Sequence, residues 1–364
     1  MKVISSSLCS IFLGAVHEGL QQEVDSMKVS ALFVLCDENT KEKCVPKILD
    51  LFPDTKIIMV SSGERNKNID ACRIIWSALI KYGADRTSMI LNVGGGVICD
   101  MGGFAAACYQ RGIRFGHIPT TVMAMGDAAI GGKLGVDHDG FKNYVGLIQN
   151  PAFIWVDPIF IETLPVTEIR SGMSEVVKHA IIGSEKLWAK LEKIKSLETL
   201  SWNDMIEESI SVKIKIVEKD LRENGQRKVL NFGHTIGHAL ESYCLTREIE
   251  MKHGHCVALG MLAESQIAFS QKLLNRTDFE AITTTIDQLL TPWIPDFPSV
   301  DKLLPWLEGD KKKLNGRVGF SLPDKIGSCQ WDIPVSTNGI AESLDWLREH
   351  LNSVPFRLRV EKHN

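Results

Sequence analysis

Two histidines four residues apart, His234 and His238, have the spacing that most directly suggests chemistry. In a helix this spacing places both imidazoles on one face. His253 and His255 follow soon after, and Glu175 opens an earlier run with helical character. Two imidazoles and a carboxylate, with one coordination position open, form a common catalytic zinc set. A lone helical histidine is usually structural. This clustering instead favours a metal site, with His234 and His238 as ligands and Glu175, His253 or His255 as the third.

A second group of residues suggests nucleotide binding. The glycines 94–96 follow a β-rich run and precede a helical one. Such a turn lets a pyrophosphate approach the free N–H groups of a helix N-terminus. The pattern is not the G-x-G-x-x-G fingerprint, so a tight strand-to-helix turn is the alternative. Asp37 with Asn39, and Glu64 with Lys67, also follow predicted strands. They suit ribose hydroxyls, although solvated loop charges would look the same.

The basic residues suggest an anionic substrate. The net charge of −4 gives no general attraction to nucleic acid or to acidic membranes, so we expect neither as a partner. Anions must therefore be bound by local clusters. The candidates lie in or near the same segments: Arg111, Lys133, Lys142, Lys178, Lys213, Arg227 and the run 311–313.

The nine cysteines are scattered and never form a C-x-x-C pair. This usage argues against a disulfide framework and fits a reducing compartment. No apolar run approaches the length needed to cross a bilayer, and the N-terminal apolar stretch is interrupted by serines. We therefore expect a cytoplasmic protein.

These candidate residues need elements that bring them together. In the first half, β-rich runs alternate with amphipathic stretches, the pattern of βαβ units. We expect strands at 31–36, 56–60, 88–93, 113–118 and 153–156, with helices near 41–51, 67–82 and 97–109. After residue 165 the strand signal nearly vanishes, and 168–182, 202–221, 235–243 and 256–270 have helical patterns. The sequence predicts an α/β Rossmann-like domain with a mostly parallel sheet at 1–165, followed by an all-α domain at 166–364.

Several of these segments together resemble the 3-dehydroquinate synthase family. The resemblance is carried by GGGVICDMGGFAAACYQRGIRF at 94–115, IPTT at 118–121, GGKLGVD at 131–137, Lys142-Asn143, SGMSEVVKH at 171–179, GQRKVLNFGHTIGHALE at 225–241 and His253-Gly254. Several independent motifs in the family's order make it specific, and it covers most of the chain.

The resemblance implies roles that spacing alone leaves open. Glu175, His234 and His253 match the family's ligands for zinc or cobalt, which makes His238 a substrate contact. The positions that match NAD contacts are Asp37, Asn39, Glu64, Lys67, Gly95, Gly96, Asp100, Thr120, Thr121, Lys133, Lys142 and Thr163. The positions that match the substrate pocket are Asp127, Lys133, Asn143, Lys178, Lys213, Arg227, Asn231 and His238, with Lys311 or Lys312. Arg111 matches an arginine that reaches the neighbouring site of a homodimer.

The implied reaction converts 3-deoxy-arabino-heptulosonate 7-phosphate to 3-dehydroquinate and phosphate. It proceeds by transient oxidation with NAD, phosphate elimination, reduction, ring opening and aldol closure. The 124–135 loop departs from the family pattern, because two hydroxyls and one amide are replaced by apolar groups. The competing classes are sister cyclases of the valiolone, inosose or gadusol type, metal-dependent glycerol-dehydrogenase-like oxidoreductases, and a non-catalytic nucleotide binder. Arg227 suits a substrate with a carboxylate, a group that the substrates of the sister cyclases lack. Lys133, Asn143, Lys213 and Arg227 together argue against the oxidoreductases, which need no phosphate-binding cluster.

Overall fold

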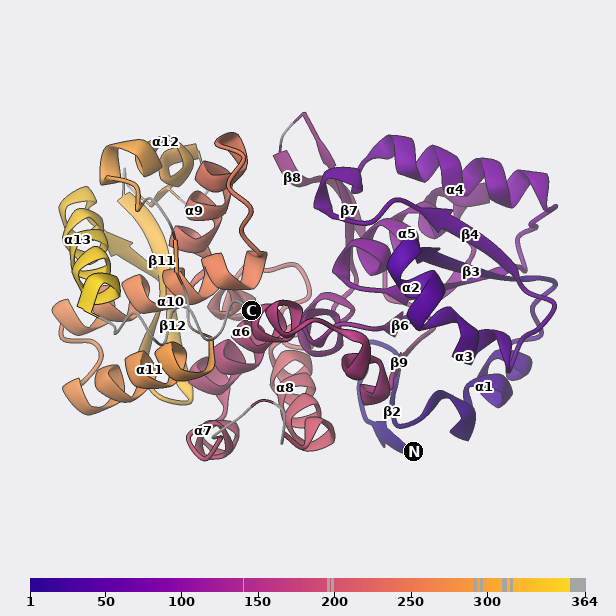
Figure 1. The fold of residues 1–364 in the computed structure, drawn as a ribbon, viewed down its shortest axis with the longest axis horizontal. Helices are drawn as coiled ribbons and strands as arrows, with labels where there is room; N and C mark the ends of the chain where they lie inside the picture. Colours follow the sequence, from indigo (N-terminus) through magenta and orange to yellow (C-terminus); the bar gives the residue numbers. More distant parts are fainter. Residues whose placement is uncertain are drawn as a thin grey trace. The chain divides into compact units, whose positions relative to one another are not determined.

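The computed structural model describes residues 1–139, 141–194, 197, 200–290, 293–294, 297–309, 313–314 and 317–353. The chain forms two compact units (Figure 1). The first comprises Met1–Pro165 with Trp202–Ile214, and the second comprises Val166–Ser201 with the residues from Lys215 onward. Among the described helices, none combines the length and the apolar character needed to span a membrane.

The first unit is built on a seven-stranded sheet. Its strands are β1 (Lys2–Ile4), β2 (Ser10–Leu13), β3 (Leu32–Asp37), β4 (Lys56–Val60), β5 (Met89–Gly94), β6 (Arg114–Pro119) and β9 (Phe153–Val156), in the order β1-β2-β9-β6-β5-β3-β4. Only the β1–β2 pair is antiparallel among these strands. All five predicted strands and the mostly parallel sheet are therefore confirmed. In a parallel sheet the carboxyl ends meet at one edge, so Asp37, Gly94 and Pro119 end their strands at the same edge.

Most helices of this unit connect strands of the sheet, whereas α8 (Trp202–Val217) follows its last strand. The helices are α1 (Leu20–Ser26), α2 (Glu38–Lys43), α3 (Val45–Leu49), α4 (Ile69–Lys81), α5 (Gly96–Cys108) and most of α8. Short helical turns are η1 (Val16–Glu18), η2 (Glu64–Asn66), η3 (Tyr109–Arg111), the π-helical η4 (Ala124–Ala128) and η5 (Pro158–Thr163). Glycines bring α5 close to β5, because a Cβ on Gly102 would lie only 2.1 Å from Asn92 Oδ1. Close packing of α5 on β5 therefore explains Gly102, one of the glycines in the 94–115 motif.

Two features of this unit were not predicted. The strands β1 and β2 lie in the serine-rich N-terminal stretch, whose polar interruptions hide the strand pattern. A separate hairpin pairs β7 (Lys133–His138) with β8 (Phe141–Ile148). Most of β8 is exposed, so it lacks the buried apolar run that signals a strand.

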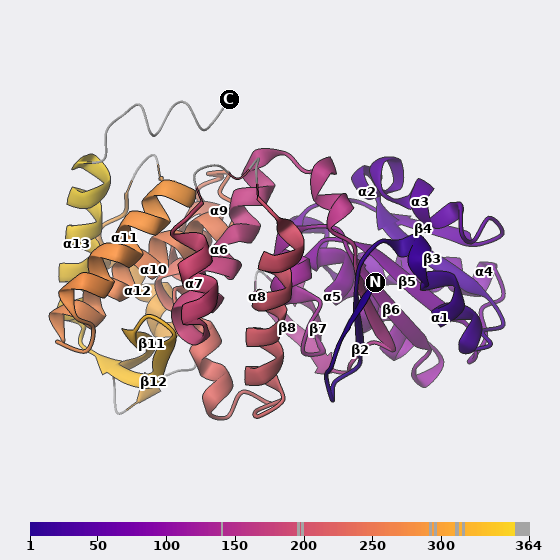
Figure 2. The same cartoon turned by 90° about the horizontal axis from the view of Figure 1, so that it is seen from below.

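The second unit is mainly helical, as expected (Figure 2). Its helices are α6 (Val166–Gly183), α7 (Glu185–Leu191), the last residues of α8, η7 (Gln226–Asn231), α9 (His234–Thr246), α10 (His253–Ser270), α11 (Arg276–Leu289), α12 (Val300–Gly309) and α13 (Thr337–Ser353). Helix α10 is buried along most of its length and contacts α6, α9, α11 and α13. It is therefore the central helix of this unit.

The expectation of an all-α second half is wrong in one respect. A three-stranded antiparallel sheet is formed by β10 (Lys313–Leu314), β11 (Arg317–Lys325) and β12 (Ser328–Val335). The alternation along β11 is interrupted by Gly319 and Pro323, and the β11–β12 register shifts twice. Because these irregularities break the period-two pattern, the sequence does not show the strands clearly.

Candidate active site

Three imidazoles converge in the second unit. His234 is the first residue of α9, His238 lies one turn later, and His253 is the first residue of α10. One ring nitrogen from each lies within 4.8 Å of the others. The packing of α9 against α10 therefore brings together histidines that are separated in the sequence.

Glu175 of α6 joins this cluster. Its Oε1 lies 3.6 Å from His234 Nε2, and its other oxygen forms an ion pair with Lys178, one turn further along α6. Two ligand atoms on a tetrahedral zinc ion are separated by about 3.4 Å, so the Glu175–His234 distance suits shared coordination. The Glu175 carboxylate is 1% exposed, and within the described residues neither oxygen has a hydrogen bond of good geometry. Such a carboxylate fits a cation site.

The local electrostatics favour neutral imidazole at His234. Burial lowers its pKa well below the usual value, and Lys178, His238 and His253 lower it further. Neutral imidazole is the form that binds metal. At His253, Nδ1 lies 3.1 Å from Glu241 Oε2. Since a carboxylate only accepts hydrogen bonds, Nδ1 carries the proton and Nε2 keeps its lone pair.

Glu241 was not singled out from the sequence. It lies seven residues after His234 on α9, which places it on the same helical face as His234 and His238. That spacing was the available signal.

The turn η7, which carries Arg227 and Asn231, ends three residues before His234 in the sequence. Arg227 is 1% exposed, and its guanidinium donates to the Leu221 carbonyl at 2.6 Å. Asn231 donates to Glu223 Oε1 at 2.5 Å. The loop before η7 is organised by Asp220, whose carboxylate accepts from the backbone N–H groups of Asn224, Gly225 and Arg227. Burial opposes ionisation of Asp220, but these donors lower its pKa.

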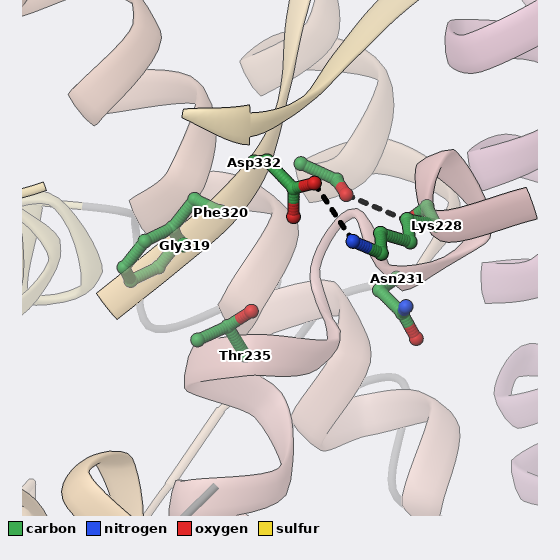
Figure 3. A pocket seen from close by; sticks show the side chains of 7 residues that line it. Lys228, Asn231, Thr235, Gly319, Phe320 and Asp332 are labelled. Atoms are coloured by element: carbon green, nitrogen blue, oxygen red, sulfur yellow. Dashed lines mark hydrogen bonds and ion pairs between the residues drawn. The ribbon is translucent and has the colours of Figure 1, made fainter. Parts of the chain in front are cut away.

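A small pocket lies next to η7 (Figure 3). It is lined by Lys228, Asn231, Thr235, Gly319, Phe320, Ser321 and Asp332. Lys228 donates to Asp332 Oδ2 at 2.7 Å, and its carbonyl accepts from the Ser321 hydroxyl at 2.6 Å. These two contacts attach η7 to the β11–β12 sheet.

The glycine loop occupies the carboxyl edge of the sheet in the first unit. Gly95 is the N-cap of α5, and Gly96 is its first residue. A Cβ on Gly95 would lie 3.2 Å from the Thr121 methyl group, and one on Gly96 would lie 3.2 Å from Ala128 Cβ. Thr120 N donates to the Gly94 carbonyl at 2.9 Å. Gly95, Gly96, Thr120 and Thr121 are thus brought together, and the N-terminus of α5 suits an anionic group.

Several charged candidates in the first unit are paired with one another. The Lys67 amine donates to Asp100 Oδ2 and to Asn143 Oδ1, both at 2.6 Å. Burial opposes the charge on Lys67, but Asp100 and Glu64 raise its pKa, so the amine stays protonated. Lys142 lies 3.6 Å from Glu64.

Asn143 is held in an unusual backbone conformation, with φ of 51°. Its backbone N–H donates to Asp137 Oδ1 at 2.8 Å, and Asp137 N donates to the Lys67 carbonyl. Asp137 thus connects the hairpin to the segment that carries Lys67.

Lys213 of α8 and Asp127 of η4 form another pair in the first unit, with Nζ 2.5 Å from Oδ1. Lys213 is buried, so its charge needs this carboxylate. The π-helical turn η4 places Asp127 in the loop whose sequence departs from the family pattern.

The remaining candidates are more dispersed. Asp37 caps α2 through Thr40, as part of a capping box, while Asn39 is exposed. Thr163 donates to the Phe160 carbonyl. Arg111 and Lys133 are exposed on η3 and β7. Lys311 and Lys312 lie outside the described residues.

Comparisons with solved structures define the fold class. The structure of 2-epi-5-epi-valiolone synthase from Streptomyces hygroscopicus, with NAD+ and Zn2+ bound, matches with a TM-score of 0.85 at 22% identity. The match covers 96% of this chain and 99% of that one. A 2-deoxy-scyllo-inosose synthase complexed with carbaglucose-6-phosphate, NAD+ and Co2+ matches with a TM-score of 0.81 at 23% identity, over 94% and 99%. The chain therefore shares the fold of these two synthases.

Sequence comparisons give the family. The model described as 3-dehydroquinate synthase N-terminal matches residues 57–171, and the C-terminal model matches 172–313. A 3-dehydroquinate synthase of Parabacteroides distasonis is 38% identical over 335 residues, which cover 91% of this chain and 95% of the relative. The chain belongs to the 3-dehydroquinate synthase family.

Proposed function

We propose that this chain converts 3-deoxy-arabino-heptulosonate 7-phosphate to 3-dehydroquinate and phosphate, as part of aromatic amino acid biosynthesis. The observation that carries this proposal is the approach of Glu175, His234 and His253 within one unit that also buries Arg227. A metal site in the unit that also buries a guanidinium suits a substrate with both vicinal hydroxyls and a carboxylate.

Residues 1–165 are proposed to bind NAD, and residues 166–364 the metal and the substrate. NAD would supply a reversible hydride acceptor, and Zn2+ or Co2+ a Lewis acid for hydroxyl and carbonyl oxygens. Gly95, Gly96, Thr120 and Thr121 form the proposed pyrophosphate site. Asp37, Asn39, Glu64, Lys67, Asp100, Lys133, Lys142 and Thr163 complete the proposed NAD contacts. Glu175, His234 and His253 are the proposed metal ligands.

The remaining residues are proposed to orient the substrate and stabilise developing charge. Lys178 and Lys213 are buried cations, which can hold hydroxyls and stabilise oxyanions away from bulk water. Arg227 offers a planar fork for the carboxylate. Asn231 and His238 would hold the phosphate, while Asp127, Lys133 and Asn143 would position the sugar. The departing phosphate can take the proton itself, so we assign no protein general base.

We also propose that the chain forms a homodimer in which Arg111 reaches the neighbouring subunit's site. We propose a cytoplasmic location as well. Exposure of Arg111 on η3 leaves its guanidinium accessible to a second copy. Mixing Arg111→Ala with Lys213→Ala should restore some activity in heterodimers, since one of the two shared sites would then be intact. Confirmed heterodimers without recovery would remove Arg111 from the site.

The alternative is a sister cyclase acting on a sugar phosphate without a carboxylate. The fold does not separate the two, because the structural neighbours include such enzymes. Arg227 favours the carboxylated substrate, because its planar guanidinium matches the two oxygens of a carboxylate, a group that the substrates of the sister cyclases lack.

The test is phosphate release from 3-deoxy-arabino-heptulosonate 7-phosphate with catalytic NAD, with and without a chelator. We expect chelator-sensitive release and no accumulation of NADH. Absence of release by folded, metal-loaded protein would favour a sister cyclase. Steady NADH formation from a polyol would favour an oxidoreductase.

A further inference from the structure

Helix α9 begins without a capping side chain of its own. Its N-cap is Gly233, whose φ of 80° is left-handed and whose lack of a side chain leaves no capping oxygen. The first N–H groups of a helix need acceptors, because they have no partner within the helix. This start matters because the first residue of α9 is His234.

The missing acceptor is supplied by Glu264 of α10. Its Oε2 accepts from Gly233 N at 2.6 Å, and its Oε1 accepts from Ile236 N at 2.9 Å. Glu264 is fully buried. A carboxylate at a helix N-terminus is stabilised by the helix dipole and by charge-assisted hydrogen bonds. Both oxygens therefore bind the backbone on either side of His234.

Glycines allow α10 to come this close. A Cβ on Gly260 would lie 1.9 Å from the Gly233 carbonyl oxygen, and one on Gly237 would lie 3.0 Å from the Cys256 carbonyl oxygen. The two helices thus meet backbone to backbone. Glu264 lies one turn beyond Gly260 on α10, so its side chain reaches the first amides of α9.

We propose that Glu264 is a positioning residue that sets the place of His234 relative to His253. The inference rests on the proposed metal site. His253 begins the helix that carries Glu264, and His234 lies between the two amides that Glu264 accepts from. One buried carboxylate therefore joins the backbones that carry two proposed ligands.

The two hydrogen bonds that Glu264 accepts, from Gly233 N and Ile236 N, are called the clamp below. Glutamine, the substitute nearest in size, cannot make both of them. Glu264→Gln keeps the size, but its amide group turns one acceptor into a donor that faces a backbone N–H. One of the two amides then loses its acceptor in a buried setting. We expect His234 to shift and metal affinity to fall by about 10- to 100-fold, the range for residues that orient ligands.

The experiment compares wild type, Glu264→Gln and Leu344→Ala as full-length proteins. Leu344 is a buried apolar residue of α13 and supplies neither of the two amides that Glu264 accepts from, so its truncation destabilises the same unit while both of these hydrogen-bond partners remain. Zinc affinity is measured by competition with a chelator, and site geometry by the visible spectrum of the Co2+ form. We expect weaker zinc binding and an altered Co2+ spectrum for Glu264→Gln only, at temperatures where all three proteins are folded.

Two outcomes would overturn the inference. If Glu264→Gln lowers Tm but binds zinc with wild-type affinity and spectrum, the clamp is purely structural. If Leu344→Ala weakens zinc binding as much as Glu264→Gln does, the effect is one of general stability. Failure of the proposed metal site is separate, because wild-type protein would then bind no zinc there. Failure of the proposed reaction alone would show as absent phosphate release by a wild-type protein that binds zinc.

Discussion

The candidate residues of the two units differ in how their charges are arranged. In the first unit, cationic candidates already contact carboxylates: Lys67 with Asp100 and Lys213 with Asp127. In the second, three imidazoles converge, and burial keeps His234 neutral. An anionic ligand in the first unit must therefore share or exchange existing partners. A cation in the second meets imidazole lone pairs already in place, and it shares the Glu175 carboxylate with Lys178. Substitutions in the two regions should have different signatures.

The largest effect is expected at the imidazole cluster. His234→Ala removes a proposed ligand and should abolish metal content and turnover, a greater loss than the about 100-fold cost of disturbing an orienting residue. Metal content is measured by elemental analysis, and turnover by phosphate release. His255→Ala is the control, because that residue lies outside the converging set. A His234→Ala protein that keeps full activity without bound metal would contradict the assignment.

The second effect concerns Arg227. Arg227→Ala should raise KM for the carboxylated substrate by about 100-fold, since a hydrogen bond to a charged group is worth ~1.5–3 kcal/mol. Steady-state kinetics give KM and kcat separately. Arg222→Ala, an exposed position in the same segment, should leave KM unchanged. An unchanged KM for Arg227→Ala would remove its carboxylate role and favour a sister cyclase.

A smaller effect is expected in the first unit. Asp100→Asn removes the anionic partner of Lys67, and KM for NAD should rise about tenfold, the equivalent of one charge-assisted hydrogen bond. Metal affinity should stay at the wild-type value, because the proposed metal ligands Glu175, His234 and His253 belong to the second unit. Asp70→Asn, which affects an exposed ion pair with Arg73, is the matched control. A parallel loss of metal would show that the regions are not independent.

A buried histidine of the first unit, His117, predicts that the free energy of unfolding depends on pH. His117 is buried in the sheet, and burial lowers its pKa to about 3. Unfolded histidine titrates near 6.5, so between these values the unfolded state binds the extra proton. Stability is therefore lost as pH falls below about 6.5, by about 2 kcal/mol at pH 5. Urea unfolding at pH 7 and pH 5 should show this loss in wild type and a smaller one in His117→Gln. The exposed His138→Gln should behave as wild type.

Much of the fold was predictable because it depends on local patterns. The strands β3, β5, β6 and β9 are mostly buried, and β4, at the edge of the sheet, is half-buried. The hairpin β7–β8 and the β10–β12 sheet were missed, since exposure in one and bulges in the other remove the periodicity. Sequence pattern therefore predicts elements whose burial is regular, and fails where packing is one-sided or irregular.

The site was predictable to a similar degree. Spacing indicated His234 and His238, with Glu175, His253 or His255 as a third ligand, and the resemblance selected Glu175, His234 and His253 instead. The structure brings His234, His238 and His253 together and places Glu175 beside His234. Glu264 left no such signal, because its partners are backbone amides of another helix. Asp37 is proposed for NAD, and the structure shows that it also caps α2 through Thr40, a role that the sequence analysis did not assign.

The smallest effect is expected where η7 meets the second sheet. Asp332 has a left-handed φ of 57° beside a register shift in β12, and this conformation directs its carboxylate to Lys228 (Figure 3). The pair is partly exposed, so its contribution is about 0.5 kcal/mol. Asp332→Asn should raise KM for the substrate about twofold by loosening η7, with kcat unchanged. The reversed pair, Lys228→Asp with Asp332→Lys, should restore part of the loss at low salt.

Glu185→Gln breaks the exposed pair with Lys325 and should leave KM unaltered. If it raises KM equally, η7 is not held by this pair, and the second unit responds to any lost surface charge.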